Sequence, residues 1–412
     1  MSLVPLDVTQ REILDAVPTL DPVDVPLRAA HGLVLAAPVS TAEPVPPFAN
    51  TAMDGYALRA ADTVGASDDE PVRLRVVDEL AAGRAPEIAV GPGEAIRIMT
   101  GAPMPEGADA IVMVEQTRAA GAGGVPGDVD ICAQAAPAQH VRAAGGDLKA
   151  GQTVFEAGTV LSAAAIGVLA SVGAATVTAH PRPKVGVLST GDELVQGGPL
   201  APGKIRDSNR PMLLGLAEEA GVEPIDLGIA VDDEDHIVAI LEDAFARCDA
   251  VLTSGGVSVG DYDYVKAALD RFGALEWRQV AIKPAKPLAF GVVKGVPVFG
   301  LPGNPVSSLV SFECFARPAL LQMGGHRARF RPQVVAAADA DMARRADGKL
   351  HLDRVRVRWI GDGYVAARTG DQASNVLSAT AAANGLALLP DGDGLRAGDR
   401  IDVWLLDAPA DH

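Results

Sequence analysis

The sequence contains little cysteine, and this limits the redox and metal chemistry that it can support. Its 412 residues include three cysteines, Cys132, Cys248 and Cys314, which are far apart, odd in number and in no CxxC pattern. This arrangement argues against a disulfide framework and against a zinc site. A reducing cytoplasm is therefore the expected location.

Positive charge is also scarce. The chain has 35 lysine and arginine residues against 53 aspartate and glutamate residues, which gives a formal net charge of −18. Non-specific binding of nucleic acid needs a basic surface, so we expect no nucleic-acid partner. A small anionic substrate is still compatible with this charge, because a few nearby lysines outweigh distant charges in salt solution.

Long hydrophobic runs are missing as well. The first residues, MSLVPLDVTQREIL, lack the apolar core of a secretory signal. An uncharged stretch at 161–179 has the length of a membrane span, but it is mostly Ala, Gly, Ser and Thr, and Gly173 interrupts it. We predict a short helix over 162–172, a strand over 175–179 and no membrane segment.

Glycine and proline are plentiful instead, with 44 and 30 residues, and they separate short apolar runs. Between about 71 and 160 these runs alternate apolar and polar residues, which is typical of β-strands. From about 183 to 325 they alternate with helical patterns, which indicates a mostly parallel sheet covered on both faces. After about 330 the β pattern returns and predicts a small barrel or sandwich.

Three turns in the α/β region carry the strongest functional signal. The segments 184–194, 249–264 and 296–308 each look like a buried strand, a glycine-rich turn and then a helix. In an open parallel sheet such turns meet at the carboxyl edge, where ligands bind. Their backbone N–H groups suit an anion and their carboxylates suit a hard cation. The pattern predicts a phosphorylated substrate that is handled with a divalent metal.

These turns have structural interpretations too. Asp192 and Glu193 are either ligand contacts or first-turn acids that favour a helix dipole. The segment 253–263 is either a ligand loop or a solvated loop. The loop KPAKP at 283–287 is either a phosphate clamp built from two ammonium groups or an ordinary surface loop. In PGNPVSS at 302–308, Pro305 is predicted to begin a helix and leave free N–H groups facing outward.

Two further motifs lie outside this region. In NTAMDGYA (50–57), we expect Met53 and Tyr56 to pack around Asp54 and leave its carboxylate little solvent. The segment 97–116, RIMTGAPMPEGADAIVMVEQ, contains Asp109, which is either a turn former or a functional acid.

Taken in order, these phrases resemble the molybdopterin molybdenumtransferase family, the MoeA and gephyrin E-domain type. The resemblance covers nearly the whole chain and extends to HVRAAGGDLKAG, GKIRDSN, KPLAFG and GDQASNVLSATAAANGLALLP. It implies an elongated homodimer that takes adenylylated molybdopterin and molybdate, uses a divalent cation such as Mg²⁺, releases AMP and forms molybdenum cofactor. A molybdopterin adenylyltransferase and molybdoenzymes are the implied partners.

The resemblance also implies a fold: a multidomain α/β plus β protein. We expect a linker and dimerisation domain at 1–40 and 146–180, and a β-rich insertion domain at 41–145. A central three-layer α/β/α molybdopterin-binding domain follows at 181–328, and a C-terminal β-barrel-like domain at 329–412.

Functional residues are implied motif by motif, with an active site assembled across the dimer. The catalytic set is Asp54, Thr100, Asp147, Glu193, Asp232 and Asp263, of which Glu193 and Asp263 would also bind the metal. The substrate-binding set is Thr190, Gly191, Asp192, Ser254, Gly255, Gly256, Ser258, Lys283, Lys286, Pro302, Gly303, Asn304 and Pro305.

The chain departs from the family at two points. Gly146-Asp147 stands where the family often has GED, and PAKP stands where it often has PGKP. We expect Ala285 to make this loop less able to adopt a positive φ.

Two rival functions are retained. One is a related adenylyltransferase, which would activate molybdopterin with ATP and release pyrophosphate. The other is a non-catalytic scaffold, which the intact acids speak against.

Overall fold

The computed structural model describes residues 3–120, 125–255, 264–273 and 275–409. The chain forms two compact units. Unit 1 consists of Met1–Asp24, Gly32–Ala36 and Thr178–His412, and unit 2 of Val25–His31 and Ala37–Val177. In the described part of the chain, no helix has the length and apolar character needed to cross a membrane.

Unit 2 contains a six-stranded sheet in the order β8-β5-β7-β6-β10-β9. Its strands are β5 (Gly55–Leu58), β6 (Val72–Leu80), β7 (Glu94–Ile98), β8 (Ala110–Met113), β9 (Thr117–Ala120) and β10 (Gly127–Ile131). Alternating side chains of β6 enter the core, because successive residues of a strand face opposite sides. The β pattern read in this part of the sequence is confirmed.

Short elements complete unit 2 and the adjoining chain. The helix α2 (Ala163–Ser171) begins where the Ser162 hydroxyl accepts the Ala165 N–H at 3.2 Å. The strand β13 (Thr176–His180) follows, so the predicted helix and strand in the uncharged stretch are confirmed. The other strands are β1 (Val23–Pro26), β2 (Val34–Leu35), β3 (Val39–Ser40), β4 (Asn50–Thr51), β11 (Val141–Arg142) and β12 (Thr153–Phe155).

Unit 1 is built on a second six-stranded sheet, in the order β17-β14-β18-β22-β21-β19. Its strands are β14 (Lys184–Thr190), β17 (Glu223–Ala230), β18 (Ala250–Ser254), β19 (Leu275–Gln279), β21 (Pro287–Val293) and β22 (Val296–Leu301). The first four strands in the sheet order are parallel, and β21 runs antiparallel to both β22 and β19. All residues of β18 and β22 are buried, as expected for strands covered on both faces.

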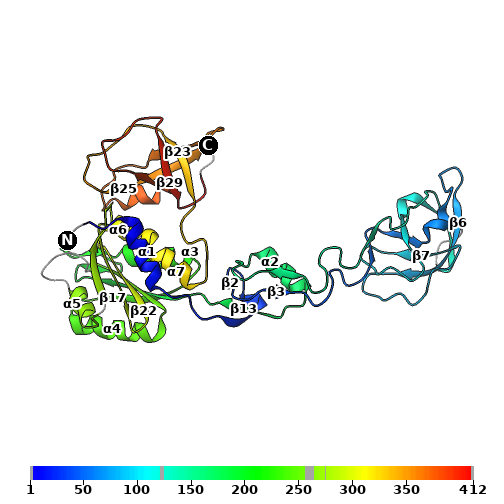
Figure 1. The fold of residues 1–412 in the computed structure, drawn as a ribbon, viewed down its shortest axis with the longest axis horizontal. Helices are drawn as coiled ribbons and strands as arrows, with labels where there is room; N and C mark the ends of the chain where they lie inside the picture. The colour runs from blue at the N-terminus through cyan, green and yellow to red at the C-terminus, as the bar shows by residue number, and fades with distance from the viewer. Residues whose placement is uncertain (1–2, 121–124, 256–263, 274, 410–412) are drawn as a thin grey trace. The chain divides into compact units, whose positions relative to one another are not determined.

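Helices cover both faces of this sheet, as Figure 1 shows, so the predicted three-layer α/β/α arrangement is confirmed. One face carries α1 (Leu6–Ala16), α3 (Asn209–Glu219), α6 (Pro305–Ser311), a π-helical turn (Phe312–Ala316) and α7 (Arg317–Met323). The other face carries α4 (Glu234–Arg247) and α5 (Tyr264–Asp270).

The C-terminal part of unit 1 is a closed five-stranded barrel. Its strands follow the order β25-β26-β23-β29-β27, and β27 pairs with β25 to close the ring. The bounds are β23 (Gln333–Ala338), β25 (Leu350–Trp359), β26 (Tyr364–Arg368), β27 (Gly385–Leu389) and β29 (Arg400–Leu405), with α8 (Leu377–Ala381), β24 (Met342–Ala343) and β28 (Gly394–Leu395) between them. A further strand, β20 (Ile282–Lys283), pairs with β25 and so joins the lysine loop to the barrel.

Candidate functional site

The three predicted turns meet at one edge of the unit 1 sheet, which we call the carboxyl edge. The strands β14, β18 and β22 are neighbours, and pairing of Ser189 with Ser254 and of Ser254 with Leu301 brings their ends level. The strand β21 is antiparallel, with Ala289 opposite Gly300. The lysine loop that precedes β21 therefore lies at the same edge.

Gly255 permits the close approach of the first two turns. Its φ is +99°, and a Cβ atom there would lie 2.9 Å from the carbonyl oxygen of Thr190. The Gly255 N–H donates to the Leu301 carbonyl at 3.1 Å. A larger residue would therefore force the first and second turns apart.

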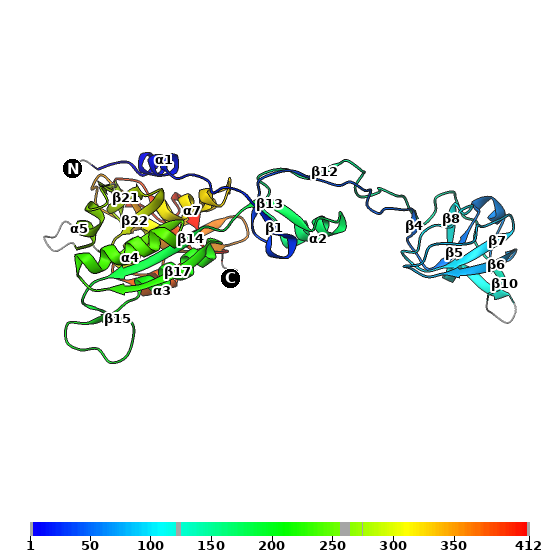
Figure 2. The same cartoon turned by 90° about the horizontal axis from the view of Figure 1, so that it is seen from below.

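The first turn differs from the prediction, because no helix follows it directly. The chain instead runs through β15 (Leu194–Val195) and β16 (Ile205–Arg206), an excursion visible in Figure 2, and α3 begins only at Asn209. The N–H groups of this turn are already used: Gly191 donates to Ala230 O at 3.3 Å, and Asp192 donates to Asp232 Oδ2 at 3.2 Å. The expected anion site at a helix N-terminus is therefore wrong here, and so is the first-turn interpretation of Asp192.

The two acids of the first turn have different surroundings. Asp192 and Asp232 are bonded reciprocally, because the carboxylate of each accepts the backbone N–H of the other, at 3.2 and 3.1 Å. The side chain of Glu193 is exposed and folds back over Gly191, where a Cβ atom would lie 2.5 Å from Glu193 Oε2. Among the described residues, no three His, Cys, Asp or Glu side chains gather in a way that could hold a metal ion.

The third turn begins α6 as predicted, with Asn304 at the N-cap and Pro305 at the first helical position. Its N–H groups do not all face outward. Val306 N–H donates to Ser374 O at 3.2 Å, and Asn304 Nδ2 donates to Ser374 Oγ at 3.1 Å. A barrel loop thus satisfies one of the N–H groups that we expected to be free for a ligand.

The lysine loop adopts the conformation that its alanine was expected to resist. Ala285 has a φ of +71° and is 2% exposed. A left-handed alanine costs about 1–2 kcal/mol. Burial of its methyl group returns about 0.8 kcal/mol of this. Lys283 and Lys286 on either side of it are exposed.

Lys283 and loops of the barrel together line an open cleft of about 810 Å³. Its charged lining is Lys283, Arg344, Arg345, Asp347, Asp353, Arg368 and Asp371. Burial would raise the pKa of Asp347, but hydrogen bonds from Lys349 and His351 outweigh it and lower the pKa to about 2. The cleft therefore holds several cations beside the carboxyl edge, partly neutralised by fixed carboxylates.

A buried network beneath the carboxyl edge was missed by the sequence analysis. Asp207 is 8% exposed, and its Oδ1 accepts from Ser189 Oγ, Asn209 N and Arg210 N, each at 3.1 Å. Arg210 also donates to Asp207 Oδ2 and to Asp226 Oδ2. Burial lowers the pKa of Arg210, yet the hydrogen bonds to Asp226 and Asp207 outweigh it and raise the pKa.

Asn209 connects this network to the turns. Its Nδ2 donates to Ser254 Oγ at 2.8 Å and to Gly303 O at 2.7 Å. Its Oδ1 is buried without a hydrogen-bond partner in the part of the chain that the structure describes. The phrase GKIRDSN was the only sequence signal for these residues, and it names no role.

Unit 2 presents a separate polar pair. Asp54 Oδ1 accepts from both Thr100 N and Thr100 Oγ1 at 2.6 Å. The side-chain hydrogen bond from Thr100, followed by the backbone one, lowers the pKa of Asp54. Asp54 is exposed, as is Met53 at 41%, so the prediction that Met53 and Tyr56 shield this carboxylate is wrong.

The remaining predicted residues are placed as follows. Asp147 is exposed in unit 2, and Asp109 accepts the Ala60 N–H at 2.6 Å, which favours its interpretation as a turn former. Gly256, Ser258, Asp261 and Asp263 lie outside the described residues.

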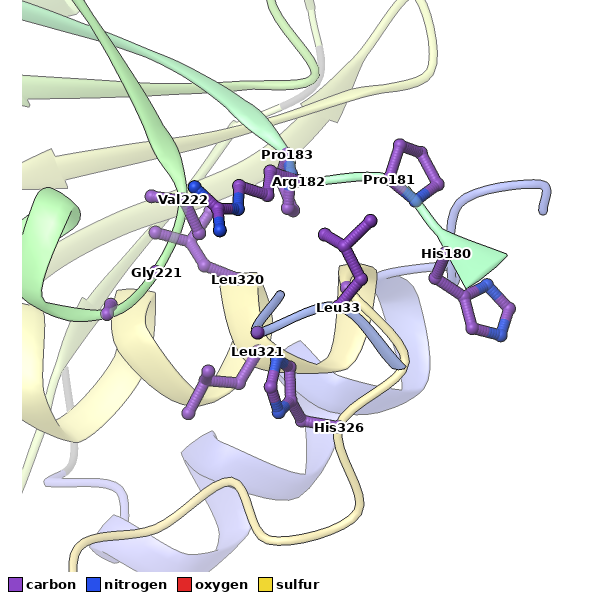
Figure 3. A pocket seen from close by; sticks show the side chains of 13 residues that line it. Leu33, His180, Pro181, Arg182, Pro183, Gly221, Val222, Leu320, Leu321 and His326 are labelled. Carbon is purple, nitrogen blue, oxygen red and sulfur yellow. The ribbon is translucent and has the colours of Figure 1, made fainter. Parts of the chain in front are cut away.

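A small pocket in unit 1 is unrelated to these residues. Figure 3 shows its lining, which includes Leu33, His180, Arg182, Leu321 and His326. Its volume is about 10 Å³, so it has room for one water at most. None of the predicted site residues lines it.

Comparisons with known proteins agree with this architecture. Residues 4–173 match the family described as the MoeA N-terminal region (domain I and II), residues 186–322 a probable molybdopterin binding domain, and residues 340–406 the MoeA C-terminal region (domain IV). Two solved structures of a molybdopterin biosynthesis MoeA protein from Pyrococcus horikoshii have TM-scores of 0.80 and 0.78, at 32% and 31% identity. They cover 99% and 98% of this chain and 100% of their own.

Curated relatives extend over the whole length. Molybdopterin molybdenumtransferase 2 from Mycobacterium tuberculosis is 40% identical over 96% of this chain and 98% of its own. Molybdopterin molybdenumtransferase from Nostoc sp. is 38% identical over 97% of this chain and 93% of its own. The chain therefore belongs to the molybdopterin molybdenumtransferase family.

Proposed function

We propose that this protein is a transferase of molybdenum cofactor biosynthesis that inserts molybdenum from molybdate into adenylylated molybdopterin and releases AMP. The observation that carries the proposal is the convergence of three turns, two lysines and Glu193 on one sheet edge. The names of the relatives that match this chain over nearly its full length, molybdopterin molybdenumtransferases, support the same proposal.

Cleavage of the phosphoanhydride requires charge neutralisation at the phosphates and a positioned attacking oxygen. Because several N–H groups of the turns are bonded within the protein, we assign the phosphate oxygens to Lys283 and Lys286. The cations of the barrel cleft suit molybdate, which is also an oxyanion. Thr190, Ser254 and the third turn would line the pterin.

Mg²⁺ is part of this proposal. Glu193 is exposed at the carboxyl edge, and its carboxylate oxygens are the ligand type that this cation prefers. Mg²⁺ commonly takes one or two carboxylates and completes its shell with phosphate oxygens and water, which fits the lack of a larger cluster among the described residues. We assign Glu193 and Asp263 to it; when bound, it would neutralise phosphate charge.

Asp54 would complete the site from the second protomer of a homodimer. Its lowered pKa keeps it ionised at neutral pH, so it cannot touch an oxyanion directly and is a weak general base. We assign it the role of orienting a bound cation or water. The acids Asp147 and Asp232 would support the site. A cytoplasmic location, a supplying adenylyltransferase and receiving molybdoenzymes belong to the same proposal.

The function is tested by incubating the purified protein with adenylylated molybdopterin, molybdate and Mg²⁺ and measuring AMP by chromatography. AMP release that depends on molybdate is expected. Release of pyrophosphate from ATP and molybdopterin would instead identify an adenylyltransferase. Absence of both reactions would favour a scaffold.

Thr100→Val is expected to raise the pKa of Asp54 towards the usual aspartate value, because it removes the side-chain hydrogen bond and keeps the backbone one. A carboxylate whose pKa is lower in the folded than in the unfolded protein stabilises the fold at pH values above its unfolded-state pKa. This contribution is lost as the pH falls through the folded-state pKa. The variant should therefore lose less stability on acidification. Carboxyl-carbon NMR measures the pKa.

The matched control for this experiment is Thr178→Val, which removes a similar hydrogen bond from Thr178 Oγ1 to Asp24 at 2.8 Å. It should leave the Asp54 titration unchanged. An unchanged Asp54 titration in Thr100→Val would contradict the assigned cause.

A further inference from the structure

The side-chain amide of Asn209 joins two of the three turns at the carboxyl edge. Its Nδ2 donates to Ser254 Oγ at 2.8 Å and to Gly303 O at 2.7 Å. Ser254 ends β18 and is 2% exposed, whereas Gly303 belongs to the exposed part of the third turn. One amide group therefore links the buried end of a strand to a turn that meets solvent.

The orientation of this amide is fixed by its partners. A carbonyl oxygen only accepts hydrogen bonds, so the nitrogen of the Asn209 amide, and not its oxygen, must face Gly303 O. Both N–H bonds of Nδ2 are used, one for each turn. A carboxylate of the same shape would set one acceptor against another, so this position requires an amide and not an acid.

Asn209 is itself held on a rigid base. It is the first residue of α3, it is 8% exposed, and its backbone N–H donates to Asp207 Oδ1 at 3.1 Å. Asp207 also accepts from Ser189 Oγ of β14 and from Arg210 Nε, each at 3.1 Å. The amide of Asn209 therefore reaches the turns from a fixed position, unlike a side chain on the surface.

The hydrogen bond to Gly303 also sets the direction of the next N–H group. In a planar trans peptide, the carbonyl and the following N–H point in opposite directions. Because Gly303 O is turned towards Asn209, the Asn304 N–H points away from it. Gly303 and Asn304 are both exposed, so the third turn presents this donor on its open side.

The third turn is supported from two sides. On the barrel side, Val306 N–H donates to Ser374 O at 3.2 Å. On the sheet side, a Cβ atom at Gly303 would lie 3.8 Å from Gly255 Cα, so the second and third turns are in van der Waals contact. Loss of the Asn209 amide would release the turn on the sheet side and leave the barrel side attached.

We propose that Asn209 is a positioning residue of the transferase reaction, which acts on the substrate through the third turn. This inference rests on the proposed function, in which the third turn lines the pterin. The phosphate oxygens are assigned to Lys283 and Lys286, which lie in a different loop. Loss of the Asn209 amide should therefore weaken the hold on the pterin and leave the hold on the nucleotide phosphate unchanged.

The decisive variant is Asn209→Asp, which keeps the shape of the side chain and sets a carboxylate against Gly303 O. The KM for adenylylated molybdopterin should rise about tenfold, the effect of losing one good hydrogen bond. The kcat should change less than about twofold, because a contact remote from the phosphoanhydride binds substrate and transition state alike. The measurement is the initial rate of AMP formation over a range of substrate concentrations.

AMP itself is the internal reference, because it carries the phosphate and lacks the pterin. Its dissociation constant, measured by isothermal titration calorimetry, should stay within about twofold of the wild-type value in Asn209→Asp. Equal weakening of AMP and of the full substrate would show a general loosening of the site and would overturn the proposal.

A second variant covers the case in which the introduced carboxylate prevents folding. Asn209→Ala removes both hydrogen bonds without adding a charge, and it should raise the KM about threefold or more. Circular dichroism verifies that each variant is folded.

The matched control for a structural effect is Asn384→Asp in the barrel. Asn384 is 4% exposed, and its Nδ2 donates to the carbonyls of Val357 and Ala408 at 3.0 and 3.1 Å. Its replacement should lower the thermal unfolding midpoint, because two carbonyls lose their donor, and should leave the KM unchanged. A KM increase in this variant equal to that in Asn209→Asp would mean that stability alone is responsible, against the proposal.

The failure of this inference differs from that of the proposed function. A wild-type protein that releases AMP, with unchanged KM in the folded Asn209 variants, would remove the inference alone. A wild-type protein that releases no AMP would remove the proposed function, and the inference with it.

Discussion

Glu193→Gln is expected to slow AMP release by about 10²–10³-fold, the usual effect of removing one group that stabilises charge in a transition state. Among the described residues, the exposed Glu193 side chain makes no ion pair, and it folds over Gly191, so the fold should not change. The measurement is the initial rate of AMP formation with adenylylated molybdopterin and molybdate, together with the thermal unfolding midpoint.

Glu223→Gln is the matched control for this variant. Glu223 is also exposed, but it lies at the start of β17, at the opposite edge of the same sheet. Its replacement should leave the rate unchanged. A full rate in Glu193→Gln would remove Glu193 from the proposed site.

Mixing Glu193→Gln with Asp54→Asn tests assembly of the site across the homodimer. Random reassociation makes half of the dimers mixed, and each mixed dimer has one intact site of two, so the activity should recover to about one quarter of the wild-type value. No recovery, in a sample shown by mass spectrometry to exchange subunits, would mean that both acids act within one protomer.

Asp207→Ala is expected to lower the free energy of unfolding by about 3–5 kcal/mol, the cost of removing one partner from a buried ion pair. The Asp207 side chain is 1% exposed, and its loss leaves Arg210 with Asp226 alone and frees the N–H groups of Asn209 and Arg210. The effect should extend to the site, because Asn209 spans Ser254 and Gly303.

The measurement is urea denaturation followed by fluorescence of Trp277, which lies in β19 of the same sheet, after Trp359 and Trp404 in the barrel have been replaced by phenylalanine. Asp243→Ala is the control. It removes an exposed ion pair with Arg247 on α4 and should cost about 0.3–0.5 kcal/mol. Equal effects of the two substitutions would contradict the structural role of Asp207.

Local patterns predicted the layers and the turns for a physical reason. Burial of β14, β18 and β22 on both faces requires continuous apolar runs, and close approach of their ends requires glycine. Both features can therefore be recognised directly in the sequence. The β-rich part of unit 2 can be recognised in the same way, from the alternation of apolar and polar residues along β6.

The errors arose where the outcome depends on distant residues. Asp192 was interpreted as an acid in the first turn of a helix, but no helix follows it directly. A pair of short strands intervenes, and the Asp192 N–H donates to the Asp232 carboxylate. Free N–H groups were expected at α6, yet Ser374, about seventy residues later in the chain, accepts one of them. The positive φ of Ala285 is tolerated because burial of its methyl group offsets part of the strain.

The sequence by itself determined the fold class, the convergence of the three turns and the family, because each depends on residues that are contiguous in the chain. Only the tertiary structure decided that Asp207 and Asn209 support those turns and that Asp54 is exposed and bound to Thr100. Each of these depends on which groups from separate segments are brought within hydrogen-bond distance or withdrawn from water, and no local pattern encodes that.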